Sequence, residues 1–200
     1  FVNNSNSSAL SVSGGGSWQV WSSNSDPFNT NASLADVRGG LSYNFKQYNA
    51  SFGATAVAGS GNGFLYTYAP TVSGALTGTV TKVYNGDTAA TLTAGNYSVS
   101  GNVDGDGVVL SQPGSGTYTS VGTGLGVKDV GTGKTVTVTG VSVVSATNGA
   151  ATLYGYGLSS STLTGSVGEI TAKGLTVTGT TVANKVYDGT TTATLSNGSL

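Results

Sequence analysis

The chain has 200 residues, a formal net charge of −1, 33 glycines against 3 prolines, and no cysteine, histidine or methionine. Only 8% of its residues are charged, against about 25% in an average globular protein, and the basic residues form no stripe, which argues against nucleic acid and anionic membranes as partners. Near-neutral charge together with ten tyrosines, five phenylalanines and two tryptophans favours a folded chain over a disordered one, and no apolar stretch is long enough to insert into a membrane.

Residues 1–73 differ in amino-acid composition from the rest of the chain, because they contain both tryptophans and a stretch rich in asparagine and serine. We interpret them as a separate β-rich N-terminal region. Near its end, Phe64, Tyr66 and Tyr68 alternate with other residues, which predicts an aromatic ladder along one face of a strand.

The next segments predict short strands and tight turns. Residues 82–88 (KVYNGDT) indicate a strand, a turn and a second strand, because Asn-Gly readily takes the positive φ angles of hairpin turns. Residues 134–140 (KTVTVTG) alternate strictly, which places the valines on a buried face and the threonines on a solvated one, and residues 174–179 (GLTVTG) repeat that pattern. No window keeps a helical apolar spacing free of glycine, so almost no helix is expected.

An internal repeat organises the second half of the chain. The motif at 82–88 recurs as KVYDGTT, 103 residues later, at 185–191. A period of about 100 residues indicates a repeated domain, whereas solenoid repeats run about 20 to 50 residues. We therefore predict a complete repeat domain at 74–173 and the opening strands of a second, incomplete repeat at 174–200. The repeat signature, to which we assign a structural role, consists of Lys82, Val83, Tyr84, Asn85, Gly86, Lys185, Val186, Tyr187, Asp188 and Gly189.

The repeated motif also carries a family resemblance. Residues 185–195 (KVYDGTTTATL) resemble the signature of the YDG repeat domain of filamentous-haemagglutinin-type bacterial exoproteins, and residues 128–138 and 170–177 resemble further stretches of that domain. The first copy departs from the pattern with Asn85 in place of the usual aspartate. The resemblance implies secretion across the Gram-negative envelope by a two-partner route, with an outer-membrane secretion partner and tandem domains that follow a β-helical shaft.

The residue types exclude most catalytic chemistry. Without histidine or cysteine, no Ser-His-Asp or Cys-His arrangement and no His-ligated metal can form, and Glu169 is the only glutamate. We therefore predict that the chain is not an enzyme and has no catalytic residue, no cofactor and no metal site. Asp104 and Asp106 in residues 103–107 (VDGDG) leave one alternative open, since they are spaced like calcium ligands, but a plain Asp-Gly hairpin turn is the favoured interpretation.

Other side chains suggest binding or modification. Four aromatic residues could stack against sugar rings, although core packing is favoured: Trp18, Trp21, Tyr66 and Tyr68. The two tryptophans, three residues apart, are expected on opposite faces of a strand, and the repeated Tyr84 and Tyr187 are expected in domain cores. A Lys-Asn or Lys-Asp isopeptide crosslink would need a neighbouring acid such as Glu169. Sequons for glycosylation, many expected by chance in so Ser/Asn-rich a chain, occur at Asn3, Asn6, Asn31, Asn49, Asn96 and Asn197.

We predict an all-β fold of tandem β-sandwich or β-grasp-like domains behind a β-rich N-terminal region. The leading functional hypothesis is a structural and adhesive segment of a large secreted or surface-displayed bacterial protein, which serves as an extracellular shaft or matrix element. Its expected partners are neighbouring domains or copies of the same protein, and host or matrix glycans. Two alternatives are a filament subunit that self-assembles by strand addition at residues 174–200, and a glycan-binding module.

Overall fold

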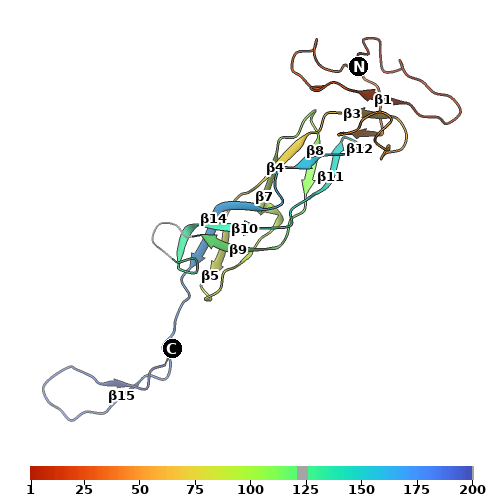
Figure 1. Cartoon of the computed structure of the whole chain (residues 1–200). Coiled ribbons are helices and arrows are strands. Elements are labelled where there is room, and N and C mark those ends of the chain that lie inside the picture. The colour runs from red at the N-terminus through yellow and green to blue at the C-terminus, as the bar shows by residue number, and fades with distance from the viewer. Residues whose placement is uncertain (121–125, 200) are drawn as a thin grey trace.

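The computed structural model describes residues 1–120 and 126–199, and it is an elongated, almost entirely β structure (Figure 1). The described residues contain one 3-10 turn, η1 (Ala94–Asn96), and no other helical element. The all-β prediction is therefore confirmed. Among these residues, no helix has the length and apolar character that crossing a membrane requires.

A six-stranded sheet joins the N-terminal region to the repeat. Its strands, in spatial order, are β1 (Gln19–Ser22), β3 (Gly63–Tyr66), β2 (Phe45–Gln47), β12 (Ala151–Tyr154), β11 (Val143–Asn148) and β8 (Gly107–Leu110). The first three precede residue 73 and the last three follow it. Strand β2 runs parallel to β12, with Phe45 beside Thr152 and Gln47 beside Tyr154. The domain boundaries stay predictions, but the strands on the two sides of residue 73 share one hydrogen-bonded sheet.

Two further sheets complete the repeat. The five-stranded sheet contains, in spatial order, β5 (Val80–Val83), β14 (Leu163–Thr171), β10 (Gly131–Val138), β9 (Ser115–Ser120) and β6 (Ala89–Thr91). The three-stranded sheet contains β13 (Gly157–Leu158), β4 (Thr71–Leu76) and β7 (Tyr97–Ser100). The predicted alternation in β10 is confirmed, because Val136 and Val138 are buried while Thr135 and Thr137 are partly exposed.

The five-stranded sheet curls toward closure. Its two outer strands, β5 and β6, lie beside each other and are joined by residues 84–88. The predicted strand, turn and strand are present here. The two strands do not pair as a hairpin, however, because β5 hydrogen-bonds to β14 and β6 to β9.

The core is divided between the two ends of this body. Side chains from all three sheets pack into one mainly aliphatic core inside the repeat, which also includes Tyr118. The N-terminal region has an aromatic core, in which Phe64 and Tyr66 stack on the same face of β3 with ring centroids 6.3 Å apart. Tyr68 packs against this cluster, whereas Leu65 faces a second, smaller one. The predicted aromatic ladder is confirmed.

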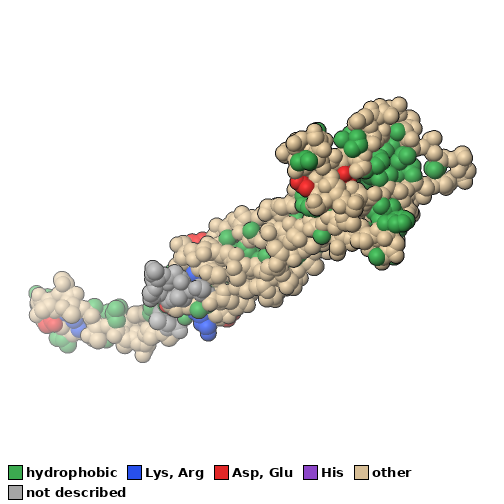
Figure 2. All heavy atoms as spheres, turned by 45° about the horizontal axis from the view of Figure 1, so that its top comes forward, with side chains coloured by type: hydrophobic (Ala, Val, Ile, Leu, Met, Phe, Trp, Pro, Cys, Tyr) green, Lys and Arg blue, Asp and Glu red, His purple; other side chains and the backbone are tan. Residues whose placement is uncertain are grey.

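The segment after residue 173 extends away from the repeat (Figure 1). It holds one small sheet, formed by β15 (Thr181–Val182) and β16 (Leu195–Ser196). The alternating strand predicted at 174–179 is wrong, because this stretch makes only an isolated bridge at Thr178. Leu175 and Val177 are 70% and 58% exposed, since no described strand lies against them to bury one face. Figure 2 shows hydrophobic side chains at the surface of this segment and at the N-terminal end.

Candidate functional site: a buried charged cluster

The most unusual polar feature is a buried charged cluster where the N-terminal region meets the repeat. Two of its residues, Asp104 and Asp106, lie in a tight turn after β7, in which Asp104 and Gly105 have φ angles of 54° and 68°. The Asp106 N–H donates to the carbonyl oxygen of Val103 over 2.9 Å, as in a type I′ turn. The predicted Asp-Gly turn is confirmed, but it connects strands of different sheets, β7 and β8, and closes no hairpin.

Lys46 reaches this turn from the middle of β2. All three residues of β2 are buried, and the Lys46 side chain is fully inaccessible. Its Nζ lies 2.6 Å from Asp104 Oδ2 and in direct contact with Asp106 Oδ1. The ring centroids of Phe28 and Tyr48 each lie 5.6 Å from the same nitrogen, so aromatic rings shield the ion pairs from water.

Arg38 supplies a second cation. Its guanidinium donates two hydrogen bonds of 2.6 Å to the two oxygens of Asp104, which is the strong bidentate geometry. Burial alone would raise the pKa of Asp104, but the hydrogen bonds from Arg38 and Lys46 outweigh it and hold that pKa below its usual value. Two cations therefore face two carboxylates, and the cluster is electrically balanced.

Asp106 is fully buried and has hydrogen-bond donors on both oxygens. Tyr48 and Tyr156 donate their hydroxyls to Oδ2 over 2.5 and 2.8 Å, while Asn148 donates to Oδ1 over 2.8 Å. Burial and the hydrogen bond to the neighbouring carboxylate both raise the pKa of Tyr48, and the pKa of Tyr156 is raised chiefly by burial. Both tyrosines are thus held as hydroxyl donors.

This arrangement speaks against the calcium alternative. Lys46 forms ion pairs with both Asp104 and Asp106, and Arg38 pairs with Asp104, so cationic side chains already neutralise the two carboxylates. Among residues 1–120 and 126–199, no group of three or more acidic side chains is placed to hold a metal. Sequence reasoning found the two aspartates but missed their cationic partners, and the one available signal is a lysine in an aromatic-rich stretch, residues 43–48, that has no other charged residue.

The signature motif forms a second, smaller network. Lys82 Nζ makes an ion pair with the Asp87 carboxylate and donates a 3.2 Å hydrogen bond to the carbonyl oxygen of Ala89. It therefore links β5 to β6 across the seam, by which we mean the line where these two outer strands lie beside each other. Gly86 provides the left-handed turn between them, with a φ of 80°. These contacts lie at the surface and hold the two outer strands together.

The second motif copy forms the same contact between its lysine and an acidic residue, here called the lysine clamp, but the acidic residue stands at another position. Lys185 Nζ lies 2.8 Å from Asp188, which occupies the position of Asn85 in the first copy. In the first copy the carboxylate comes from Asp87, two residues later, and in the second copy that position holds Thr190, which also bonds to Lys185. Hydrogen bonds from the clamping lysine lower the pKa of Asp87 and of Asp188. The Asn85 departure is therefore compensated within the loop.

The aromatic residues named from the sequence are divided between buried cores and the surface. Trp18 and Tyr66 are buried in the N-terminal aromatic core. Trp21 packs on the opposite face of the sheet, against Phe52, so the expected separation of the tryptophans is confirmed. The expectation that the repeated tyrosines lie in domain cores is wrong, because they lie at the edge of the turn: Tyr84 is 42% and Tyr187 is 93% exposed.

Two of the six sequons are sterically closed in the folded chain. Asn3 is buried, and its Nδ2 donates to the carbonyl oxygens of Asn6 and Arg38. Asn96 is also buried and is bonded to Thr93 and Thr77. The other four are exposed: Asn6, Asn31, Asn49 and Asn197.

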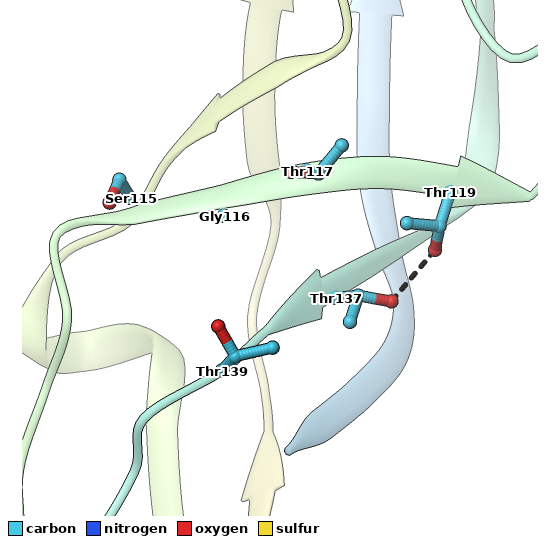
Figure 3. Close-up of a pocket in the computed structure, with 6 residues that line it drawn as sticks. All are labelled: Ser115, Gly116, Thr117, Thr119, Thr137 and Thr139. Carbon is cyan, nitrogen blue, oxygen red and sulfur yellow. Dashed lines mark hydrogen bonds between the residues drawn. The ribbon is translucent and has the colours of Figure 1, made fainter.

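The outer face of β9 and β10 carries a shallow hollow of about 320 Å³. Figure 3 shows its lining, which is formed by Ser115, Gly116, Thr117, Thr119, Thr137 and Thr139. Thr119 and Thr137 share a hydrogen bond of 2.7 Å between their hydroxyls. This cross-strand pair stabilises the sheet, and the hollow has no charged or aromatic lining residue for chemistry.

Comparison with known proteins finds one related domain. The sequence model of the YDG domain matches residues 67–162, which include the first motif copy at 82–88. Asp104 and Asp106 lie inside the matched segment and Lys46 lies before it, so the buried cluster connects the YDG domain to the preceding region. No curated protein and no solved structure matches the chain.

Proposed function

We propose that this chain is a structural and adhesive segment of a large secreted or surface-displayed bacterial protein, of the filamentous-haemagglutinin type, and that it serves as an extracellular shaft. The observation that carries the proposal is the six-stranded sheet, which continues from the N-terminal region into the YDG domain through the β2 and β12 pairing. A shared ladder of backbone hydrogen bonds resists separation of the two parts, and this is the mechanical property that a shaft needs.

The second motif copy supports a tandem arrangement. Leu175 and Leu195 stand 103 residues after Val72 and Leu92. The earlier pair is 0% and 4% exposed, whereas the later pair is 70% and 64% exposed. The same positions become core once strands surround them, so residues 174–199 are suited to packing with further β-structure. Each added repeat of about 100 residues would lengthen such a shaft by roughly 30 Å.

Surface chemistry fits an extracellular setting. The chain is held together by backbone ladders, threonine pairs and buried contacts, and it carries few charged groups at its surface. Such contacts depend little on salt. Copies of the same protein, neighbouring domains and an outer-membrane secretion partner are the partners that this role requires.

Strand addition is the second candidate, and one observation favours it. Within the part of the chain that the structure describes, the small sheet of β15 and β16 pairs with no other strand, and Val182 and Leu195 are exposed on it. Exposed edges of this kind can pair with a strand of another molecule. A glycan-binding role has less support, because two of its four aromatic candidates, Trp18 and Tyr66, are buried.

Negative-stain electron microscopy of residues 1–200 across a concentration series tests the proposal. Isolated elongated particles at every concentration are the expected result. Ordered fibres that disappear in a matched variant lacking residues 174–200 would instead make self-assembly by strand addition the function. Compact particles without a long axis would contradict both.

A further inference from the structure

We propose that Lys46 and Asp106 join as an intramolecular isopeptide bond that ties the N-terminal region covalently to the YDG domain. The proposal concerns the chemistry of the buried cluster and does not depend on the shaft function. Lys46 is the nucleophile, Asp106 the electrophile and Asp104 the proton acceptor.

The reacting groups are already in contact. Lys46 Nζ touches Asp106 Oδ1, and both side chains are fully inaccessible to solvent. Lys46 is held by a buried three-residue strand, and Asp106 is the last residue of the type I′ turn, so both backbones are fixed by hydrogen-bonded structure. Well-oriented groups held together in this way react as an intramolecular pair with a large effective concentration.

The neighbouring groups match the charges that develop during amide formation. Asp104 Oδ2 lies 2.6 Å from Lys46 Nζ and can accept the proton that the amine must lose before it attacks the Asp106 carboxyl carbon. Tyr48 and Tyr156 donate to Asp106 Oδ2, which becomes the oxyanion of the tetrahedral intermediate. Donors aimed at that oxygen are the usual means of stabilising such an intermediate.

The step balances without any other reactant. An ammonium and a carboxylate become a secondary amide and one water molecule: the C–N bond forms, the carbon to Oδ1 bond breaks, and two of the three ammonium protons leave with Oδ1 as water. Asp104 accepts a proton from nitrogen and returns it to the leaving oxygen, so it is unchanged at the end. No oxidation or reduction occurs.

The charge count supports the bond. Before reaction, Arg38 and Lys46 balance Asp104 and Asp106; afterwards one charge of each sign has disappeared, and Arg38 and Asp104 still form their bidentate pair. Removing two buried charges relieves the cost of keeping them away from water.

The other lysine-aspartate contacts lack this setting. Lys82 meets Asp87, and Lys185 meets Asp188, but the two carboxylates are 55% and 54% exposed. Water competes for both groups there, so these pairs stay ionic and serve as internal controls. Glu169, the acid named from the sequence, accepts a hydrogen bond from Thr81 at the surface and is not part of the cluster.

Mass spectrometry of the denatured 200-residue chain tests the proposal. The expected mass is lower than the sequence mass by one water molecule, and the full sequence mass would overturn the proposal in favour of a buried ion pair. An Asp-Gly sequence can lose the same water by closing to a succinimide, so the site of loss must be located.

Trypsin digestion locates it. Cleavage after a crosslinked Lys46 is blocked, so residues 39–82 should appear joined to residues 83–128 as one branched peptide. Separate peptides 39–46 and 83–128, with the water loss confined to one of them, would overturn the proposal. Unmodified cleavage after Lys82 and Lys185 is expected in the same digest.

The Asp104→Asn variant tests the proton acceptor, and Asp87→Asn is its matched control at an exposed clamp. We expect the branched peptide to fall from the major product to a trace in Asp104→Asn and to stay unchanged in Asp87→Asn. Full crosslinking in Asp104→Asn would remove Asp104 from the proposal. If this variant fails to fold, the wild-type digest still decides whether the bond exists.

Discussion

Two buried tyrosines offer a controlled test of the hydrogen bonding in the cluster. Tyr48 and Tyr66 are each 1% exposed, and their rings stack with centroids 5.7 Å apart. The Tyr48 hydroxyl donates to Asp106, whereas the Tyr66 hydroxyl has no hydrogen-bond partner among the described residues. Replacing either tyrosine with phenylalanine removes the same oxygen from the same aromatic core, so the difference between the variants isolates the hydrogen bond.

The expected effects differ in sign. Tyr48→Phe should lower the free energy of unfolding by about 1 to 2 kcal/mol, because Asp106 loses one of two hydroxyl donors and Tyr156 remains. Tyr66→Phe should be neutral or stabilising by up to about 1 kcal/mol, because it removes a buried polar atom without a partner. With a urea m-value of about 2 kcal/mol/M, the midpoint of Tyr48→Phe falls by about 0.5 to 1 M. Equal destabilisation of both variants would refute the reasoning and assign the effect to ring packing.

Three further outcomes follow from the same geometry. Urea midpoints measured against pH should be highest between about pH 4 and pH 10, and a flat profile would contradict this. The pKa of Asp104 is lowered in the folded chain, so its stabilising contribution is complete above about pH 4 and is lost as pH falls through the folded-state pKa. The pKa of Tyr48 is raised, so its stabilising contribution is lost as pH rises beyond about 10. Gly155→Ala should destabilise the fold clearly more than Gly86→Ala. Both glycines have a positive φ, so each substitution costs about 1 to 2 kcal/mol in backbone strain, but a Cβ at Gly155 would also clash with the backbone oxygen of Tyr48. Equal losses of melting temperature would show that no such clash exists. Removing residues 174–200 should leave the melting temperature of the remaining chain unchanged, because their side chains are exposed, and a lower value would reveal packing against the repeat.

Local alternation made part of the fold predictable. The strict spacing in β10 places Val136 and Val138 inside, and the spacing in β3 stacks Phe64 on Tyr66, because a strand sends successive side chains to opposite faces. The same spacing around Leu175 gave no buried strand, because alternation describes a strand only where a second strand and a core are available to it.

The buried cluster could not be found in this way. Lys46 and Asp106 are 60 residues apart, and their strands reach one sheet because β2 pairs with β12, β12 with β11 and β11 with β8, an order that no local pattern encodes. The sequence Asp104-Gly105 predicts a tight turn, but the direction in which the carboxylates of the turn point depends on the sheets that flank it. In the same way, Tyr84 looked like a core residue by repetition alone, whereas its position beside the seam leaves it partly exposed.

The proposed shaft requires the N-terminal region and the YDG domain to form one continuous structural unit. Native-state hydrogen exchange at the joint tests this directly, through the Tyr48 amide, which is bonded to Tyr154, and the Thr152 amide, which is bonded to Asn44. If the sheet is continuous, both amides are strongly protected and their opening free energies agree within about 1 kcal/mol, as expected of one cooperative unit. Fast exchange at these two amides while the Val136 amide stays protected would show that the N-terminal region opens independently, and it would contradict the proposed shaft.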